Sequence, residues 1–406
     1  MVNNSSKSSL AKIKTIINSD IIKKIQTILV NQKTTSYLVG GCIRDALLEN
    51  PLKDIDISIS SNPKDIGLKI ANTLQGKLIN LHIPSKSFRI ILNNPITPLN
   101  IDLTQTKGDI KSDLTNRDFT INSLAVPLSS PNSKTDPLII DPFNGIEDIK
   151  DKKIKLTTSH ALDDDPLRML RAQRLATYLN FSIDNETKIH IKKKSSKLTN
   201  SSPERIRDEF LAILASKNVA QSLYALDDLN LLGILIPELM ECKNIIQPKY
   251  HYWDVFNHSI QTAHYIEYII KETPIKNYDL PFKFLKYSAS TNNHFETPYS
   301  DTQNKLTLLK LAALLHDIGK PITEFKDNSG KISFIGHDKE GANLTERILN
   351  RLRLSNHGIE YIKKMVLYHL RPNQISNNNN LPSKKALYRY FRDLGNASCD
   401  ILYLNL

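Results

Sequence analysis

The stretch from Tyr37 to Ser60 has the clearest pattern of apolar and polar positions in the chain. An apolar run is followed by two glycines, a short amphipathic segment, and a second run in which isoleucine alternates with aspartate or serine. Because strand residues two apart point to the same side of a sheet, Asp54 and Asp56 share one face and the isoleucines between them share the other. The pattern predicts strand, turn, helix and strand, with one acidic face and one buried face.

Similar patterns predict a small sheet around this stretch. Isoleucine and leucine recur at helical spacing from residue 10 to residue 30, which predicts one amphipathic helix. Asn62-Pro63 is typical of a helix start, and three apolar runs between residues 76 and 105 predict strands. Asp118 is expected to cap an apolar helix within residues 116–125. The sheet is therefore expected to be antiparallel or mixed and flanked by helices.

The apolar period changes to 3.6 at Leu162 and stays there, so the rest of the chain is expected to be helical. Its first helix is predicted over residues 163–176, with Leu167, Leu170 and Leu175 facing inward. A polar stretch with prolines, residues 273–304, is predicted to be a loop. The predicted fold class is α+β: a small mixed sheet with helices, followed by an all-α body.

Composition narrows the class of protein. The chain has 406 residues, which favours two or three domains, and a net charge of +12, which favours a polyanionic partner such as nucleic acid. Three scattered cysteines in no C-x-x-C spacing argue for a reducing compartment, with the cytoplasm as the default. No apolar run of about twenty residues is present, so a soluble protein without a membrane partner is expected.

The acidic face predicts a divalent metal. Two carboxylates as close as Asp54 and Asp56 repel each other unless a cation neutralises them, and Mg²⁺ is the natural candidate. Asp102 lies in a third apolar strand, and polymerase-type sites use three carboxylates for two metals. An ordinary aspartate near a strand end would give the same pattern at Asp102.

The glycines and nearby arginines predict a phosphate site. Gly40-Gly41 ahead of a helix lets the backbone approach a phosphate, with Arg44 as a charged partner. Arg117 stands at the start of the 116–125 block, where it can meet a triphosphate or a base. Each motif alone also fits a surface strand-turn-helix, but the glycine pair followed by the acidic pair favours nucleotidyl transfer.

The helical part holds two further groups of polar residues. Asp165, Arg168, Arg171 and Arg174 step by three along one helix side, where an Asp-Arg pair can read a base edge. Spacing alone favours the alternative, a salt bridge between Asp164 and Arg168. Four histidines with one adjacent aspartate indicate a metal site, since a His-Asp pair in an apolar helix needs compensation: His258, His316, His337, His369 and Asp317.

These ordered blocks resemble one family: bacterial tRNA nucleotidyltransferases and poly(A) polymerases, class II of the polymerase-β-like superfamily, with a C-terminal HD domain. The resemblance runs from about Tyr37 to Leu406 and rests on LVGGCIRDALL with DIDIS, RDFTINSLA, DPFNGIEDI, DDDPLRMLRAQRLA, SPERIRDEF and the HD pattern. It implies a tail and helix over 1–30, a nucleotidyltransferase head over 31–157, a nucleotide-selecting and RNA-binding neck over 158–240, and an HD domain over 241–406.

The resemblance also implies roles by position. Asp54 and Asp56 would be Mg²⁺ ligands, the glycine pair and Arg44 triphosphate contacts, and Arg117 a nucleotide contact. Asp165 and Arg168 resemble an amino-acid template that selects CTP and then ATP, with Arg171 and Arg174 binding the same nucleotide, which reverses the preference for a salt bridge. The implied activity is template-independent addition of C, C and A to the 3′ end of tRNA by two-metal, in-line transfer.

Departures from the family pattern set further expectations. Asn116 replaces an arginine, Asp164 replaces a glutamate, and no arginine follows Asp102 closely. The chain ends at Leu406, ahead of the Asp that completes the HD metal site in relatives, so an incomplete HD domain is expected, with His258, His316 and Asp317 as ligands of a second divalent metal.

Other functions share these blocks. CC-adding, A-adding and poly(A) polymerase activities use every block quoted, and the sequence leaves them open, as it does the oligomeric state. A different class is an HD phosphohydrolase whose N-terminal half only positions RNA. A third is a non-catalytic RNA-binding relic, which would be expected to have lost Asp54 or Asp56.

Overall fold

The computed structural model describes residues 4–52, 54–82, 87–92, 99–128, 137–247, 252–271, 289–376 and 381–405. Its contacts divide the chain into two compact units. The first comprises residues 1–164 and 181–187, and the second comprises residues 165–180 and 188–406. None of the described helices is both long and apolar enough to cross a membrane.

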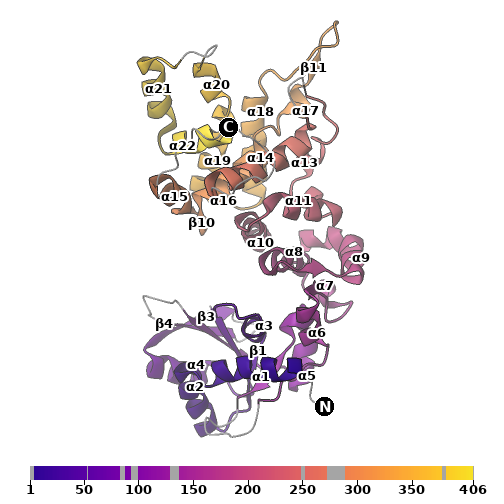
Figure 1. Cartoon of the computed structure of the whole chain (residues 1–406), viewed down its shortest axis with the longest axis vertical. Coiled ribbons are helices and arrows are strands. Elements are labelled where there is room, and N and C mark those ends of the chain that lie inside the picture. The colour runs from indigo at the N-terminus through magenta and orange to yellow at the C-terminus, as the bar shows by residue number, and fades with distance from the viewer. Residues whose placement is uncertain are drawn as a thin grey trace. The chain divides into compact units, whose positions relative to one another are not determined.

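The first unit, drawn from indigo to magenta in Figure 1, is built on a sheet of six strands, and their order is β3-β4-β5-β2-β1-β6. Its strands are β1 Ser36–Val39, β2 Asp54–Ile59, β3 Gly76–His82, β4 Ser87–Leu92, β5 Asn100–Gln105 and β6 Ala125–Pro127. The pairs are antiparallel except for β2 and β5, which run parallel. The predicted mixed sheet is confirmed.

The opening stretch folds as predicted, with β1, the helix α3 Gly41–Leu47 and then β2. Ile55, Ile57 and Ile59 are buried, whereas Asp54 on the other face is exposed. The helix α4 Pro63–Leu74 begins at the predicted Asn62, whose side chain accepts a hydrogen bond from Lys64 N. It packs on the sheet so closely that a Cβ on Gly67 would lie 2.8 Å from Leu78 Cδ1.

Two predictions about helices in this unit are wrong. The single helix expected over residues 10–30 is two helices, α1 Asn4–Ile17 and α2 Asp20–Asn31, because Ser19 caps a new helix start by accepting from Ile22 N. The block 116–125 forms only the 3-10 turn η1 Thr120–Asn122 before β6, and Asp118 accepts from Phe119 N at 2.8 Å. The chain is diverted because Ala125 pairs with Val39 at the sheet edge.

The first unit is completed by short elements. They are α5 Ile110–Thr115, α6 Gly145–Lys150, α7 Ala161–Asp164, and the parallel pair of β7 Lys153–Ile154 with β8 Ser182–Ile183. A small core of Val39, Leu114 and Ala125 joins the sheet to α5.

The second unit is helical, as predicted. Its helices are α8 Arg168–Leu179, α9 Asn185–Lys194, α10 Pro203–Ala215, α11 Val219–Asp228, α12 Leu232–Leu235, α13 Pro237–Met240, α14 Val255–Lys271, α15 Ala289–Glu296, α16 Lys305–Leu315, α17 Lys320–Thr323, α18 His337–Arg351, α19 Asn356–Tyr368, α20 Arg371–Ile375, α21 Lys384–Leu394 and α22 Ser398–Leu404. Short hairpins, β9 Pro298–Ser300 with β10 Gln303–Asn304 and β11 Phe325–Lys326 with β12 Ile332–Ser333, and the 3-10 turns η2 Ser195–Asn200 and η4 Gly395–Ala397 complete it.

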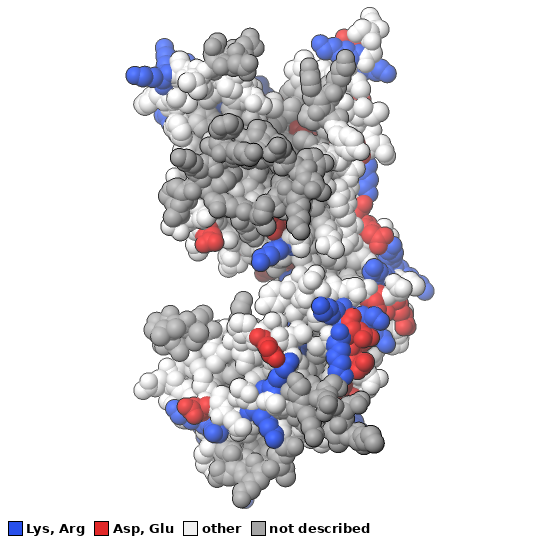
Figure 2. Space-filling view, in the orientation of Figure 1, with Lys and Arg blue, Asp and Glu red and all other residues white. Residues whose placement is uncertain are grey.

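Every residue of α16 is buried, so this helix forms the centre of the C-terminal part, in contact with α10, α14, α19 and α22. On the face shown in Figure 2, acidic and basic side chains are interspersed around α9, and Lys192 Nζ donates to Asp228 at 2.8 Å. At least one lysine of α9 is therefore paired with a carboxylate.

Two predictions for the helical part need correction. The helix expected over residues 163–176 is broken between α7 and α8, because Pro166 lacks an N–H and disfavours a helical residue before it. Leu167, Leu170 and Leu175 are nevertheless buried as predicted. Of the loop expected over 273–304, residues 273–288 lie outside the described residues, and the rest forms α15 and the β9–β10 hairpin.

Candidate functional site

Strand register brings the three predicted carboxylates of the first unit to one place. In the parallel pair β2–β5, Asp56 lies opposite Asp102 and Asp54 lies opposite Asn100. Asn100 Nδ2 donates to Asp54 Oδ1 at 3.0 Å, which holds that side chain against the neighbouring strand. Three carboxylates on two adjacent strands form a set of oxygen donors suited to Mg²⁺.

The environment of Asp56 favours a cation. The pKa of Asp56 is raised to about 6, first by burial and also by the charges of Asp102 and Asp54, while Arg117 and Arg44 act in the opposite direction. A bound divalent cation would relieve this repulsion. The three carboxylates and the raised pKa of Asp56 thus both fit a metal at this position.

Arg89 is a site residue that the sequence reasoning missed. From β4 it lies opposite Asp102, and its Nε and Nη2 donate to the two oxygens of that carboxylate at 2.7 Å each. A bidentate pair of this kind fixes the carboxylate plane. An arginine inside an otherwise apolar strand was the available signal, but the register that pairs it with Asp102 is not visible in one sequence.

Gly40 allows the backbone, an arginine and an acid to meet. Its φ is 78°, and a Cβ there would lie 2.8 Å from Arg117 Nη1 and 3.1 Å from Asp56 Oδ2. Only glycine satisfies both the backbone angle and the space. Arg117 also pairs with Asp113 at 3.4 Å, so its guanidinium is held between that acid and the turn.

Arg44 is held by its neighbours. Its Nε and Nη2 donate to the two oxygens of Asp45 at 3.0 and 2.9 Å, and its Nη1 donates to Asn122 Oδ1 at 2.6 Å. The side chain is almost completely buried beneath Gly41. These contacts hold Arg44 against the turn at Gly40 and Gly41. A direct contact between Arg44 and a triphosphate stays a prediction.

The predicted base-reading residues belong to the second unit, where two residues of α10 position them. Arg205 Nη2 donates to Asp165 Oδ2 at 2.7 Å. The oxygens of Glu209 accept from Arg171 Nε at 3.4 Å and from Arg174 Nε at 2.6 Å. The segment that carries Arg205 and Glu209 was quoted from the sequence only because it resembles the family. The roles of these two residues in positioning other side chains were therefore missed.

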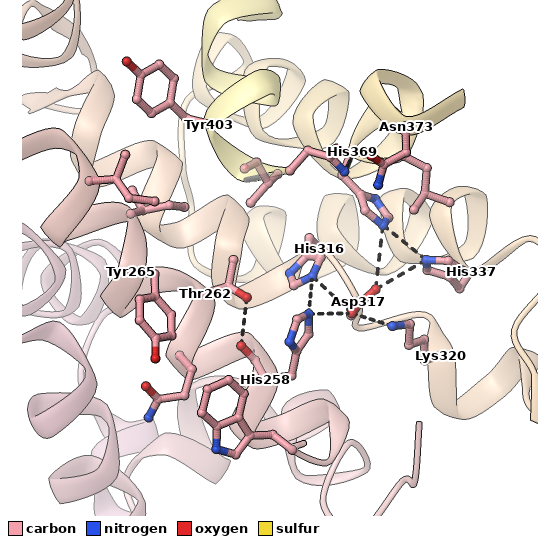
Figure 3. A pocket seen from close by; sticks show the side chains of 17 residues that line it. His258, Thr262, Tyr265, His316, Asp317, Lys320, His337, His369, Asn373 and Tyr403 are labelled. Carbon is pink, nitrogen blue, oxygen red and sulfur yellow. Dashed lines mark hydrogen bonds and ion pairs between the residues drawn. The ribbon is translucent and has the colours of Figure 1, made fainter. Parts of the chain in front are cut away.

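Five polar residues meet in the C-terminal part of the second unit (Figure 3). Asp317 is central: its Oδ2 lies 3.1 Å from His316 Nε2 and 3.4 Å from His258 Nε2, and its Oδ1 lies 3.3 Å from His337 Nε2 and 3.7 Å from His369 Nε2. Two groups of possible metal ligands therefore share one carboxylate. The structure thus brings together all four histidines and the aspartate that the sequence marked as a metal site, two more than the three ligands that the resemblance implied.

Helix ends fix the histidine rings. Nδ1 of His316, His337 and His369 lies 2.7 Å from the carbonyl oxygen three residues earlier, at Ala313, Phe334 and Val366. A carbonyl only accepts, so each Nδ1 carries a proton, and Nε2 is the ring nitrogen that is left to bind a metal. The Nε2 atoms of His337 and His369 face each other at 3.2 Å. A proton shared between the two rings, or a metal ion beside both, accounts for this close approach.

Charge in this cluster also fits a metal. Burial alone would raise the pKa of Asp317, but His316, His337 and Lys320 hold it well below its usual range. Burial and His316 lower the pKa of His369 to about 4, so its ring is neutral near pH 7. A neutral imidazole and an ionised carboxylate are the forms that bind metals.

A cavity of about 470 Å³ opens beside these ligands. Trp253, Tyr265 and Tyr403 contribute aromatic walls, and Lys320 Nζ, 2.6 Å from both Asp317 Oδ2 and Gln247 Oε1, contributes a cation (Figure 3). Polar ligands at one end and aromatic walls elsewhere are typical of a small-molecule site.

Three family models match the chain. They are the poly A polymerase head domain over residues 36–155, the probable RNA and SrmB-binding site of polymerase A over residues 180–243, and the HD domain over residues 255–395. The matches cover, in order, the sheet with its acidic cluster, the helices α9 to α13 and the histidine cluster.

Similar proteins share most of the chain. An A-adding tRNA nucleotidyltransferase of Deinococcus radiodurans is 29% identical over 339 residues, which are 82% of this chain and 68% of the relative. A CC-adding tRNA nucleotidyltransferase of Thermus thermophilus is 24% identical over 91% of this chain and 74% of the relative. The solved Thermotoga maritima CCA-adding enzyme in complex with tRNA has a TM-score of 0.65 at 20% identity, over 100% of this chain and 82% of that one, and shows a common fold.

Proposed function

Because the chain belongs to the family of bacterial tRNA nucleotidyltransferases and poly(A) polymerases with a C-terminal HD domain, we propose that it adds C, C and A to the 3′ end of tRNA from CTP and ATP. The protein is a nucleotidyltransferase. The family includes A-adding and CC-adding relatives, so the number of nucleotides added is the part of the proposal that most needs a test. We place the protein in the cytoplasm, where its free cysteines would stay reduced.

One observation carries the proposal: Asp56 faces Asp102 across parallel strands and touches the turn at Gly40. Asp54 and Asp56 would hold Mg²⁺, which when bound offsets the negative charge of the phosphates and of the attacking and leaving oxygens. The tRNA 3′-hydroxyl would attack the α-phosphate in line, and pyrophosphate would leave. Arg117, held beside Gly40, would balance charge on the triphosphate.

Nucleotide choice would rest on the second unit. The carboxylate of Asp165, which accepts from Arg205 Nη2 and from Leu167 N, would also accept from the exocyclic amine of cytosine or adenine, and Arg168 would donate to the ring acceptors. Arg205 fixes the Asp165 carboxylate, and Glu209 fixes Arg171 and Arg174. The side chains that would contact the nucleotide are therefore ordered before it binds.

Replacing Asp165 should relax nucleotide choice. Wild-type protein with Mg²⁺ and tRNAs ending at the discriminator base, at C or at CC should add C, C and A in steps. Asp165→Ala should lower the preference for the correct nucleotide by about tenfold or more, because a bidentate pair contributes ~1–3 kcal/mol of base discrimination. Product sequencing with CTP, ATP or both measures the preference.

Asp164→Ala is the matched control, because Asp164 is exposed and precedes Asp165 directly. Unchanged choice in Asp165→Ala, or an equal loss in Asp164→Ala, would contradict the selecting role. Long A tails from the wild type would move the assignment to poly(A) polymerase, and no extension at all would refute nucleotide addition.

The histidine cluster supports a second candidate activity, hydrolysis of a phosphoester. The observation that favours it is the shared Asp317, which gives two groups of ligands for divalent metal beside an aromatic cavity. Metals there would polarise a phosphoryl group and supply an activated water. Lys320 would pair with the phosphate.

Metal content tests this centre directly. After reconstitution with Mn²⁺ and removal of excess ion, His337→Ala should hold about one ion per chain fewer than wild type, because it removes a ligand from one of the two groups only. His357→Ala, which changes an exposed histidine outside the cluster, is the control. Equal metal in wild type and His337→Ala, measured by elemental analysis, would refute the assignment.

A further inference from the structure

The helix α21 is anchored by one side only. Tyr390 and Leu394 are buried, and Tyr390 Oη donates to Ser398 O at 2.7 Å. On the other side Tyr388 is 67% exposed and Phe391 is 58% exposed, with Leu387 partly exposed beside them. Two aromatic rings at the surface of a well-anchored helix are a feature that neither nucleotide addition nor the metal cluster uses.

The same helix is strongly basic. It carries Lys384, Lys385, Arg389 and Arg392 against one carboxylate, Asp393, which accepts from Arg392 Nε at 2.7 Å. All four cationic side chains are exposed, and Figure 2 shows basic side chains at the place that α21 occupies in Figure 1. Four cations against one acid on eleven residues make this helix complementary to a polyanion.

Helical geometry interleaves the rings with the cations. Lys384, Tyr388 and Phe391 stand at i, i+4 and i+7, so they lie along one side of the helix. Lys385 and Arg389 form the adjacent row. A partner that covers the rings must therefore also meet charge.

We propose that α21 is an RNA-docking surface, on which unpaired bases stack against Tyr388 and Phe391 while Lys384, Lys385 and Arg389 bind the phosphates. Aromatic side chains with neighbouring cations suit single-stranded nucleic acid, since every base has a stacking face and every nucleotide has a charge. The surface is separate from the metal cavity, whose lining includes no residue of α21. The inference rests on the proposed function in one respect: it takes the polyanion to be the RNA substrate.

The pattern favours RNA over a bilayer or a second protein. A helix that lies on a membrane has a continuous apolar face with cations along its borders, and here Lys384 occupies the arc between the two rings. The core of a protein interface is depleted of lysine, whereas this surface has two.

Direct binding of tRNA, measured without nucleotides, tests the surface. Tyr388→Ala with Phe391→Ala should weaken tRNA binding about tenfold or more, since each stacked base contributes at least about fivefold. Lys384→Ala, Lys385→Ala and Arg389→Ala together should lower the slope of log affinity against log salt by about 2, because each phosphate contact in single-stranded nucleic acid contributes ~0.7. Phe325→Ala with Lys326→Ala and Lys331→Ala, three exposed residues of the β11–β12 hairpin, is the matched control.

The outcomes separate this inference from the proposed function. Normal tRNA affinity in both α21 variants, with nucleotide addition intact in the wild type, would overturn the inference alone. Wild type that binds tRNA through α21 but adds no nucleotide would overturn the proposed function alone. Unchanged tRNA affinity together with a ring-dependent dimer, or ring-dependent binding to vesicles with one-third anionic lipid, would assign α21 to a second copy of the chain or to a membrane and refute RNA docking.

Discussion

Asp56→Asn is expected to lower nucleotide addition by at least about 1000-fold while leaving the protein folded. The loss follows because a metal ion held by this carboxylate would stabilise the charge of the transition state by several kcal/mol. A change of ~1.4 kcal/mol corresponds to a tenfold change in rate. Steady-state addition of the first C to tRNA measures it. Asp54→Asn should behave alike, since the two acids would hold the same ion.

The stability of Asp56→Asn should move in the opposite direction from its activity. The pKa of Asp56 is raised to about 6, mainly by burial, so this side chain favours folding only while it is protonated, at low pH. That contribution is lost as pH rises through about 6, and at pH 7 the ionised form opposes folding. The neutral amide should therefore raise Tm in the absence of metal.

Asp65→Asn, on the exposed side of α4, is the control for both measurements and should change neither. Retention of addition within about tenfold of wild type by Asp56→Asn would show that this cluster does not carry the chemistry. A fall in Tm with pH held at 7 would show that the buried charge is compensated better than its surroundings indicate.

Lys310→Met is expected to destabilise the second unit by about 3–5 kcal/mol, because it leaves a buried acid without its cation. Lys310 is completely buried in α16, and its Nζ donates to Leu214 O at 3.1 Å and Ser216 O at 2.9 Å and lies 3.5 Å from Glu267 Oε2. Glu267 also accepts from the backbone N–H groups of Asn218 and Val219 at 3.1 Å. One ion pair thus ties α10, α11, α14 and α16 together. Denaturant unfolding measures the effect.

Two comparisons give this second prediction its specificity. Lys363→Met removes the lysine of a partly exposed pair with Glu346 and should cost less than about 1 kcal/mol. Glu267→Gln added to Lys310→Met should recover part of the loss, since the unpaired charge is gone and the amide oxygen still accepts one of the two backbone hydrogen bonds. Equal losses in Lys310→Met and Lys363→Met would refute the buried pair as a source of stability.

Period and spacing predicted most of the first unit. The order of β1, α3 and β2, the start of α4 and the buried isoleucines followed from alternation alone, because one face of each strand must be apolar. Elsewhere, hydrogen bonds produced elements that the apolar pattern did not predict. Ser19 began a second helix inside a continuous apolar period, and pairing of Ala125 with Val39 drew an apolar run into the sheet that spacing had assigned to a helix.

The residues of the candidate site were likewise predicted only in part. Residues to which we assign the chemistry, such as Asp56 and Asp317, stood out because acids among apolar neighbours need an explanation. Residues that orient them, such as Arg89 and Glu209, did not, because their partners lie far away in sequence and an arginine or glutamate on a strand or helix has many ordinary uses. The meeting of His337 and His369 with Asp317 likewise depends on tertiary packing of α18 and α19.

The parallel pairing of β2 with β5 has a consequence for the order of folding. Parallel neighbours cannot be joined by a tight hairpin, and here the chain passes through α4, β3 and β4 before β5 returns beside β2. Asp56 and Asp102 therefore meet only when two distant stretches of the chain come together, which is a non-local event on the folding path. A nascent or partly folded chain would therefore lack the assembled acids until β5 has paired with β2.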